Sequence, residues 1–146
     1  MQRFLVDLML MHLGRWLRLL GQDAANPEGG SDNELLLQAK NESRTIITRD
    51  KELFRACTGA GVKCVLIRSS AISDQLMEMA DAGVPLRLDP QRCTLCNSLL
   101  EEMEMLGVKR WKCQACKKLY WDGGHWQKME KMLQAIRSRM SPGDQA

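Results

Sequence analysis

Two Cys-x-x-Cys pairs, separated by sixteen residues, limit what this chain can fold into more than any other feature of its sequence. The four thiols belong to Cys93, Cys96, Cys113 and Cys116. Two close pairs of thiolates at this spacing are typical of a tetrahedral structural zinc site. Because such a site has no open coordination position, any catalysis has to come from other residues.

Upstream of the cysteines, short apolar runs alternate with segments of helical pattern. The runs at 3–6, 45–48 and 62–67 predict strands, since they are apolar or β-branched. Helices are predicted at 9–20, 31–39, 51–57 and 73–80, the second one opened by the capping box Ser31-Asp-Asn-Glu34. This alternation indicates an α/β domain with a mainly parallel sheet that is covered on both faces.

Near 86–90 the alternation stops, so we expect three parts in the chain. These are an α/β domain in 1–88, a zinc ribbon in 89–126, and an amphipathic tail helix with a disordered end in 127–146. The tail places Trp126, Met129, Leu133, Ile136 and Met140 on one helical face. A protein partner on that face is one expectation.

Charge and apolar content narrow the compartment and the partners. No stretch approaches the roughly 20 apolar residues of a membrane span, and the first apolar run does not resemble a secretory signal. Paired cysteines that hold metal suit a reducing cytoplasm. Residues 1–90 carry 11 Lys/Arg against 12 Asp/Glu, and residues 91–146 carry 10 against 6, a mild basic bias that permits nucleic acid.

Three aspartates are expected at one edge of the sheet. Asp7 and Asp50 follow predicted strands and Asp32 begins a predicted helix, so in a parallel sheet all three project from the same edge. Carboxylates suit Mg²⁺ or Mn²⁺, which keep several waters and bind substrate phosphate. Aspartates at strand-to-helix turns also cap helices, and that simpler role is the alternative for each of them.

Several segments, in order, resemble the mut-seven C-terminal RNase family, a branch of the PIN-like nucleases. The matching segments are Phe4-Leu-Val-Asp7, Arg15-Trp-Leu-Arg18-x-Leu-Gly21-x-Asp23, Ser31-Asp32-x-Glu34-Leu35, Thr48-Arg-Asp50-x-Glu52-Leu53, Val65-Leu-Ile-Arg68, the two Cys-x-x-Cys pairs and Tyr120-Trp-x-Gly-x-His125-Trp126. The resemblance extends to about residue 129, and it lies in the succession of the segments.

The resemblance implies a PIN-like three-layer α/β/α domain with a C-terminal four-cysteine zinc ribbon, acting as a metal-dependent ribonuclease. Carried over to this chain, the positions that would hold Mg²⁺ or Mn²⁺ are Asp7, Asp32 and Asp50. Related sequences often place an acid after the Arg of the fourth strand, where this chain has Ser69 and Ser70. Asp74 is then the candidate for a fourth acid.

Cations near these segments are candidates for contacts with RNA phosphates. They are Arg15 and Arg18 on the first helix, Arg49 beside Asp50, and Lys112 among the aromatic residues of the ribbon. A solvated helix face explains Arg15 and Arg18 equally well. Aromatic rings among basic residues can stack on bases, or they can shield the metal in a module with little core.

Two other functions remain open. The chain could be an inactive RNA or protein adaptor on the same fold, with Ser69 and Ser70 marking a lost acid. Redox-active Cys-x-x-Cys pairs are disfavoured, because such pairs belong beside a strand-to-helix turn, whereas these lie in a Lys-rich region that we predict to be poor in strands.

Overall fold

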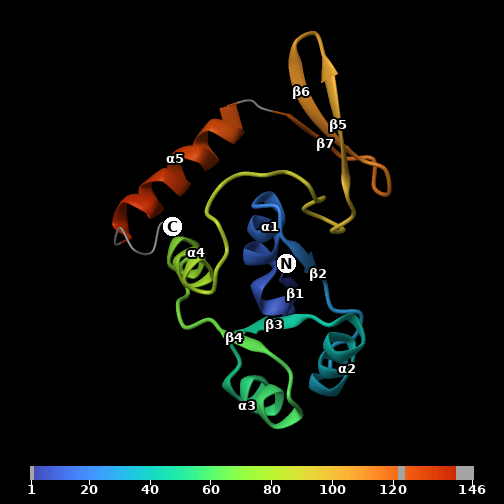
Figure 1. Cartoon of the computed structure of the whole chain (residues 1–146), viewed down its shortest axis with the longest axis vertical. Helices are drawn as coiled ribbons and strands as arrows, with labels where there is room; N and C mark the ends of the chain where they lie inside the picture. The colour runs from blue at the N-terminus through green and yellow to red at the C-terminus, as the bar shows by residue number, and fades with distance from the viewer. Residues whose placement is uncertain (1, 122–123, 141–146) are drawn as a thin grey trace.

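The computed structural model describes residues 2–121 and 124–140 (Figure 1). Its main sheet consists of β1 (Arg3–Val6), β2 (Asp23–Ala25), β3 (Thr45–Thr48) and β4 (Cys64–Leu66), all parallel and in the order β2-β1-β3-β4. The predicted mixed α/β class with a mainly parallel sheet is therefore confirmed.

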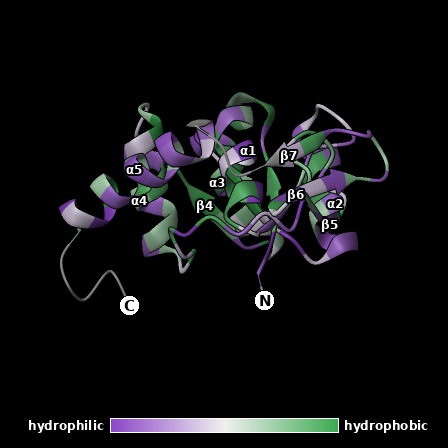
Figure 2. Cartoon of the chain, turned by 90° about the horizontal axis from the view of Figure 1, so that it is seen from above, coloured by the Kyte–Doolittle hydropathy of each residue, from purple (hydrophilic) through white to green (hydrophobic). Residues whose placement is uncertain are grey.

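Helices pack on both faces of this sheet, as the alternation along the strands requires. The short 3-10 helix η1 (Leu8–Leu10), α1 (Met11–Leu19) and α4 (Ile72–Asp81) share a core with Phe4, Val6 and Ile47. On the other face, α2 (Asp32–Glu42) and α3 (Lys51–Ala60) share a core with Leu5 and Ile46. Neighbouring residues of a strand point to opposite faces, which explains why the two cores divide β1 and β3 between them. Figure 2 shows hydrophobic residues on strand β4, between the helices.

Strand β2 was not predicted from the sequence. Asp-Ala-Ala has no β-branched or aromatic residue, so its local pattern does not favour a strand. The strand forms because Arg3, Phe4 and Leu5 pair with it in register. Gly21 leads into it with φ +81°, and a Cβ there would lie 2.9 Å from Asp89 Oδ2, so a larger residue would clash as well as strain the backbone.

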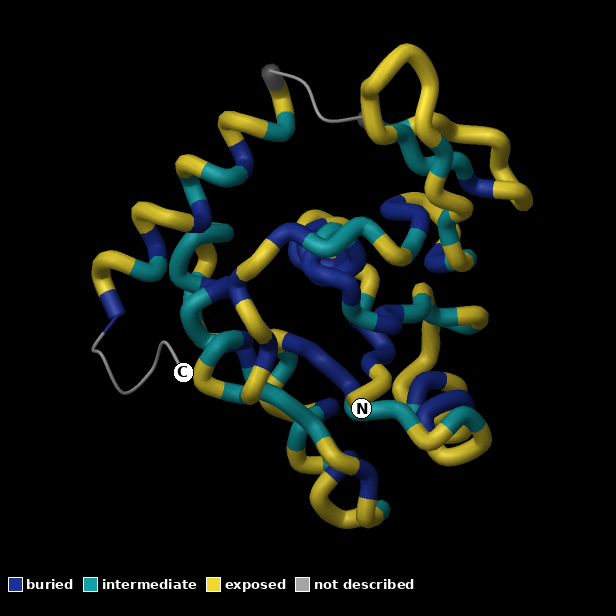
Figure 3. Tube along the Cα trace, turned by 45° about the horizontal axis from the view of Figure 1, so that its top comes forward, coloured by how far each residue is buried: buried dark blue, intermediate teal, exposed yellow. Residues whose placement is uncertain are grey.

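A second sheet, antiparallel, follows the first domain where we predicted few strands, and that expectation was wrong. It consists of β5 (Leu100–Met105), β6 (Val108–Cys113) and β7 (Leu119–Trp121), in that order. The β5–β6 hairpin turns through Leu106 and Gly107, both with positive φ (54° and 77°). Two positive φ values characterise the type I′ turn, which usually has Asn-Gly rather than Leu-Gly, so the turn signal was missed. Figure 3 shows this hairpin exposed along most of its length.

Helix α5 (Gly124–Arg139) returns to the first domain and lies beside α4 (Figure 1). The residues on its apolar face are buried in the same core as α1 and α4: Met129, Leu133, Ile136 and Met140. The face that suggested a protein partner is therefore covered by the chain itself. The predicted disordered end, 141–146, lies outside the described residues. The described helices include none with the length and apolar character needed to cross a membrane.

Candidate functional site

The four cysteine sulfurs converge, as the spacing of the two pairs predicts. Their Sγ atoms all lie within 4.8 Å of one another, with Cys93 to Cys116 at 3.3 Å and Cys96 to Cys113 at 3.5 Å. In a tetrahedron with Zn–S bonds of about 2.3 Å, adjacent sulfurs are about 3.8 Å apart. The sulfur cluster therefore fits a zinc ion with little adjustment.

The two Cys-x-x-Cys loops share one backbone geometry. In each loop, the residue after the second cysteine is left-handed, at φ 65° for both Asn97 and Lys117. The N–H of Asn97 donates to the Cys93 carbonyl, and the N–H of Lys117 donates to the Cys113 carbonyl. In turn, the N–H of Cys93 donates to the Ser98 carbonyl, and the N–H of Cys113 donates to the Lys118 carbonyl. This repeated turn places both thiols of a pair on one side, so the two loops form opposite halves of one sulfur cluster.

The thiol protons are unevenly distributed over the cluster. Burial would raise the pKa of Cys93, but hydrogen bonds from the Tyr120 hydroxyl and from backbone N–H groups outweigh it and bring the pKa to about 6. At Cys116 the Lys118 N–H favours the thiolate, but the neighbouring Cys93 raises the pKa of Cys116 to about 11. Zinc binding would displace the remaining protons, because the ligand is the thiolate.

The first cysteine loop is fixed to the α/β domain by buried polar contacts, one of which uses Arg18. The Arg18 side chain is 2% exposed and donates to Ala24 O at 2.7 Å, Thr94 O at 2.6 Å and Asn26 Oδ1 at 2.7 Å. All three guanidinium nitrogens are thus engaged by the protein. Arg18 therefore holds the first cysteine loop in place, and its guanidinium is committed to the protein rather than to an RNA phosphate.

At the carboxyl end of the main sheet, Asp7 and Asp50 are connected through one threonine. The Thr48 hydroxyl donates to Asp7 Oδ2 at 2.7 Å and accepts from the backbone N–H of Asp50 at 3.0 Å. Thr48 is fully buried and Asp7 is half-buried, so water can reach this contact only from the Asp7 side. Sequence reasoning missed Thr48. The available signal was that a hydroxyl residue ends β3, which pairs with β1, the strand directly before Asp7.

Asp50 and Asp32 differ in their local roles. Asp50 is the N-cap of α3, where Oδ1 accepts from the N–H groups of Glu52 and Leu53 at 2.9 and 3.4 Å. Asp32 is not the cap of α2, since Ser31 accepts from the Glu34 N–H at 3.1 Å. Asp32 is instead exposed at the first position of that helix. Its carboxylate is therefore not committed to capping.

The three aspartates share the edge of the sheet, but they do not form a tight cluster. Within residues 2–121 and 124–140, the group of three or more His, Cys, Asp or Glu side chains with ligand atoms all within 4.8 Å is that of the four cysteines. The aspartates do not meet that distance as a set. A hydrated Mg²⁺, which keeps several waters, suits such wider spacing better than a fully dehydrated ion.

The candidate for a fourth acid is engaged in an ion pair. Asp74, in the first turn of α4, pairs with Arg139 at 3.1 Å. Glu78 was not singled out from the sequence, yet its two oxygens accept from the N–H groups of Arg68 and Ser69 at 2.9 and 3.0 Å. Glu78 thus closes the turn after β4, where Ser69 and Ser70 stand in place of an acid.

The other predicted RNA contacts are spread over the surface. Arg15 is exposed on α1 and lines a crevice of about 450 Å³ between α1, the ribbon and α5. Lys112 lies on β6 opposite Glu101, and Arg49 is exposed directly after β3. Trp111 stacks on Trp126, with ring centroids 5.3 Å apart and planes at 6°, so these rings join the ribbon to α5.

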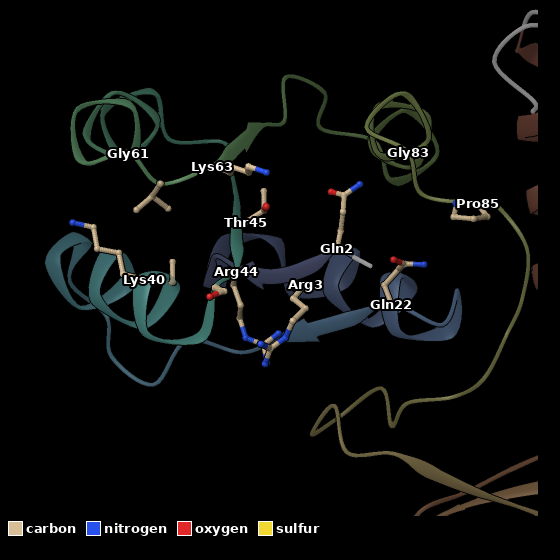
Figure 4. A pocket seen from close by; sticks show the side chains of 13 residues that line it. Gln2, Arg3, Gln22, Lys40, Arg44, Thr45, Gly61, Lys63, Gly83 and Pro85 are labelled. Carbon is tan, nitrogen blue, oxygen red and sulfur yellow. The ribbon is translucent and has the colours of Figure 1, made fainter.

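A larger cavity, of about 940 Å³, opens at the opposite end of the main sheet (Figure 4). It is lined by residues at the amino ends of the strands, including Gln2, Arg3, Thr45 and Lys63. The candidate aspartates follow the carboxyl ends. The cavity is therefore separate from the acidic edge.

An α/β domain with aspartates at the carboxyl edge of its sheet, followed by a four-cysteine module, is an arrangement suited to a nuclease with an accessory metal site. The model of the Mut7-C RNAse domain matches residues 2–133. The chain therefore belongs to the Mut7-C RNAse domain family, as its motifs indicated. No curated protein and no solved structure matched the chain.

Proposed function

We propose that this protein is a metal-dependent ribonuclease with a PIN-like nuclease domain. Asp7, Asp32 and Asp50 would hold Mg²⁺ or Mn²⁺ at the carboxyl edge of the sheet, and the cysteine cluster would hold a structural zinc ion. A bound Mg²⁺ or Mn²⁺ ion supplies polarisation of the scissile phosphate and a lower pKa for the attacking water. Membership of an RNAse domain family supports this function.

The observation that carries the proposal is the contact through Thr48. A hydrogen bond from the buried hydroxyl orients the Asp7 carboxylate and limits its rotation, and the same hydroxyl anchors the backbone of Asp50. Orientation of this kind keeps ligands in place for a cation. Within the described contacts Asp50 uses Oδ1 for both capping bonds, so Oδ2 would be the oxygen that holds the cation.

Cleavage of a labelled single-stranded RNA by the zinc-loaded protein tests this function, with and without Mn²⁺ or Mg²⁺. Asp7→Asn and Asp50→Asn should each reduce the cleavage rate by about 100-fold or more, since a bound ion contributes several kcal/mol to stabilising the transition state. Asp81→Asn is the matched control and should retain activity, because Asp81 is exposed at the last position of α4, away from the carboxyl edge of the sheet.

Thr48→Val gives a finer test, because it keeps the shape of the side chain and removes both the hydrogen bond to Asp7 and the one from the Asp50 N–H. Outer-shell partners of metal ligands typically contribute 10- to 100-fold to metal affinity or activity, so we expect the cleavage rate to fall by about that factor. Cleavage that survives both aspartate substitutions would place the activity elsewhere or in a contaminant.

The wider spacing of the three aspartates favours one alternative, an inactive adaptor that binds RNA without turnover. In that case the protein would bind RNA equally with and without Mn²⁺ and release no product. Single-turnover cleavage that depends on Asp7 would exclude the adaptor.

A further inference from the structure

A basic groove lies beside Asp50, and neither the family match nor the metal sites assign a role to it. It has a volume of about 640 Å³ and opens between the start of α3 and the end of β4. Four cationic side chains line it: Arg49, Lys51, Arg55 and Arg68. We call it the α3–β4 groove.

The charge of the groove is not neutralised by its own lining. All four cationic residues are exposed, and no acidic residue lines the groove. The ion pairs between described residues involve none of these four. Glu78, which lies against the turn after β4, is engaged by the backbone N–H groups of Arg68 and Ser69. The groove therefore favours a polyanion.

The other lining residues are apolar. Phe54 is half-buried on α3, and Leu66 and Ile67 form the end of β4 and the residue after it. An aromatic ring beside cations suits a nucleotide, whose base can stack while its phosphate is neutralised. Bases are available for such stacking in single strands, whereas in a duplex they are stacked on one another.

The groove is continuous with the candidate catalytic edge. Arg49 and Lys51 flank Asp50 in the chain, and Thr48 pairs with Leu66 across β3 and β4. Arg68 thus emerges from the same end of the sheet as Asp50. A strand of RNA lying in the groove would pass directly beside that carboxylate.

We propose that the α3–β4 groove binds the sugar–phosphate backbone of single-stranded RNA next to the scissile phosphate. This inference rests on the proposed function, since it places one flank of the substrate of that enzyme. Contacts of this kind position the strand without reading its sequence. The cations also offset the repulsion between substrate phosphates and the aspartates.

Binding of a fluorescein-labelled, mixed-sequence 12-nucleotide RNA, followed by anisotropy, tests the groove. The zinc-loaded protein is used without added Mg²⁺ or Mn²⁺, so that the RNA stays intact. The test variant is Arg55→Gln with Arg68→Gln. The matched control is Lys40→Gln with Lys63→Gln, which removes two exposed cations at the amino end of the sheet (Figure 4).

The groove variant should bind about tenfold more weakly or worse, while the control changes less than about twofold. A single-strand phosphate contact contributes about 0.7 to the slope of log affinity against log salt, so loss of two contacts should lower the slope by about 1.4. Arg55→Lys with Arg68→Lys keeps both charges and should retain most of the affinity. Zinc content and circular dichroism check that each variant is folded.

Equal losses of RNA affinity in the groove variant and the control would overturn the groove assignment. An unchanged slope of log affinity against log salt in the groove variant would also overturn it. Tighter binding of a duplex with the same dependence on Arg55 and Arg68 would overturn the preference of the groove for single strands.

A cleavage assay separates this proposal from the proposed ribonuclease function. Activity that depends on Asp7, together with normal RNA binding by the groove variant, would refute the groove alone. Weakened binding by that variant, with no cleavage by the wild-type protein, would refute the enzyme and leave the groove standing.

Discussion

Replacing Asp23 by Ala should weaken the attachment of the four-cysteine module to the α/β domain. Asp23 Oδ1 accepts from Arg44 Nη1 at 2.8 Å and from Asn97 Nδ2 at 2.7 Å, and Asn97 belongs to the first cysteine loop. Oδ2 faces Arg3 at 3.4 Å and Arg92 at 3.5 Å. The side chain of Asp23 is only 12% exposed, so water cannot replace these partners easily.

The size of the stability loss in Asp23→Ala follows from these contacts. Hydrogen bonds to a charged group contribute about 1.5–3 kcal/mol each, and the bonds from Arg44 and Asn97 are the two that are shielded. The pairs with Arg3 and Arg92 are longer and more exposed, so they contribute about 1 kcal/mol or less. Arg44 keeps Glu42 as a partner at 2.6 Å, which places the loss at the lower end. We expect Asp23→Ala to lower the free energy of unfolding by about 3 kcal/mol.

The pH dependence of this loss has a definite sign. Burial would raise the pKa of Asp23, but hydrogen bonds from Arg44 and Asn97, and the charges of Arg44 and Arg92, hold it below its ordinary value. A carboxyl with a lowered pKa stabilises the folded state above its unfolded pKa and loses that effect as the pH falls through its folded pKa. The difference between wild type and variant should therefore be complete at pH 7 and shrink below about pH 4.

Urea unfolding of the zinc-loaded protein at pH 7, followed by tryptophan fluorescence and circular dichroism, measures the loss. Asp74→Ala is the control, because it removes an aspartate from an exposed ion pair with Arg139 and should cost about 1 kcal/mol or less. If Asp23→Ala lowers stability no more than Asp74→Ala does, the ribbon is not held by Asp23 and the reasoning fails.

Two further predictions concern the cysteines. Elemental analysis should find about one zinc per chain. Cys113→Ser, which removes a buried thiol of the cluster, should lower the zinc affinity steeply. A wild-type protein without zinc and with disulfides would contradict the assignment of the cluster to zinc. Burial raises the pKa of Cys64 to about 12, so at pH 8 its thiolate fraction is about 10⁻⁴, against about a quarter for an ordinary thiol. Iodoacetamide followed by mass spectrometry should therefore label Cys64 very slowly in the folded zinc-loaded protein and rapidly in urea; labelling of the folded protein at the rate of a free thiol would refute that burial.

The parts of the fold and the candidate site that could be predicted are those set by neighbouring residues. The Ser31 hydroxyl accepts from the Glu34 N–H as the capping box predicts, while the Glu34 carboxylate accepts from that hydroxyl, and Gly61 ends α3 in the left-handed conformation. Strands 3–6 and 45–48 have the predicted bounds. The cysteine spacing correctly predicted that four sulfurs would meet. Each of these features depends on residue types a few positions apart, or on the demands of one metal ion.

Other features depend on residues that the fold brings together from distant parts of the chain. Arg18 and Thr94 are 76 positions apart, and Asp23 and Asn97 are 74 apart, so no local pattern indicates that they meet. The basic groove likewise combines α3 with the end of β4.

The sequence by itself determined the α/β class, the convergence of the four thiols and the aspartates that follow the strands, because periodicity, capping and ligand chemistry are local properties. Only the tertiary structure decided that Arg18 is a buried link rather than a surface cation, that the apolar face of α5 is covered by the core, and that Thr48 joins Asp7 to Asp50. Burial and hydrogen bonding at these positions are set by long-range packing, and the free energy of that packing is shared among residues that are far apart in the chain.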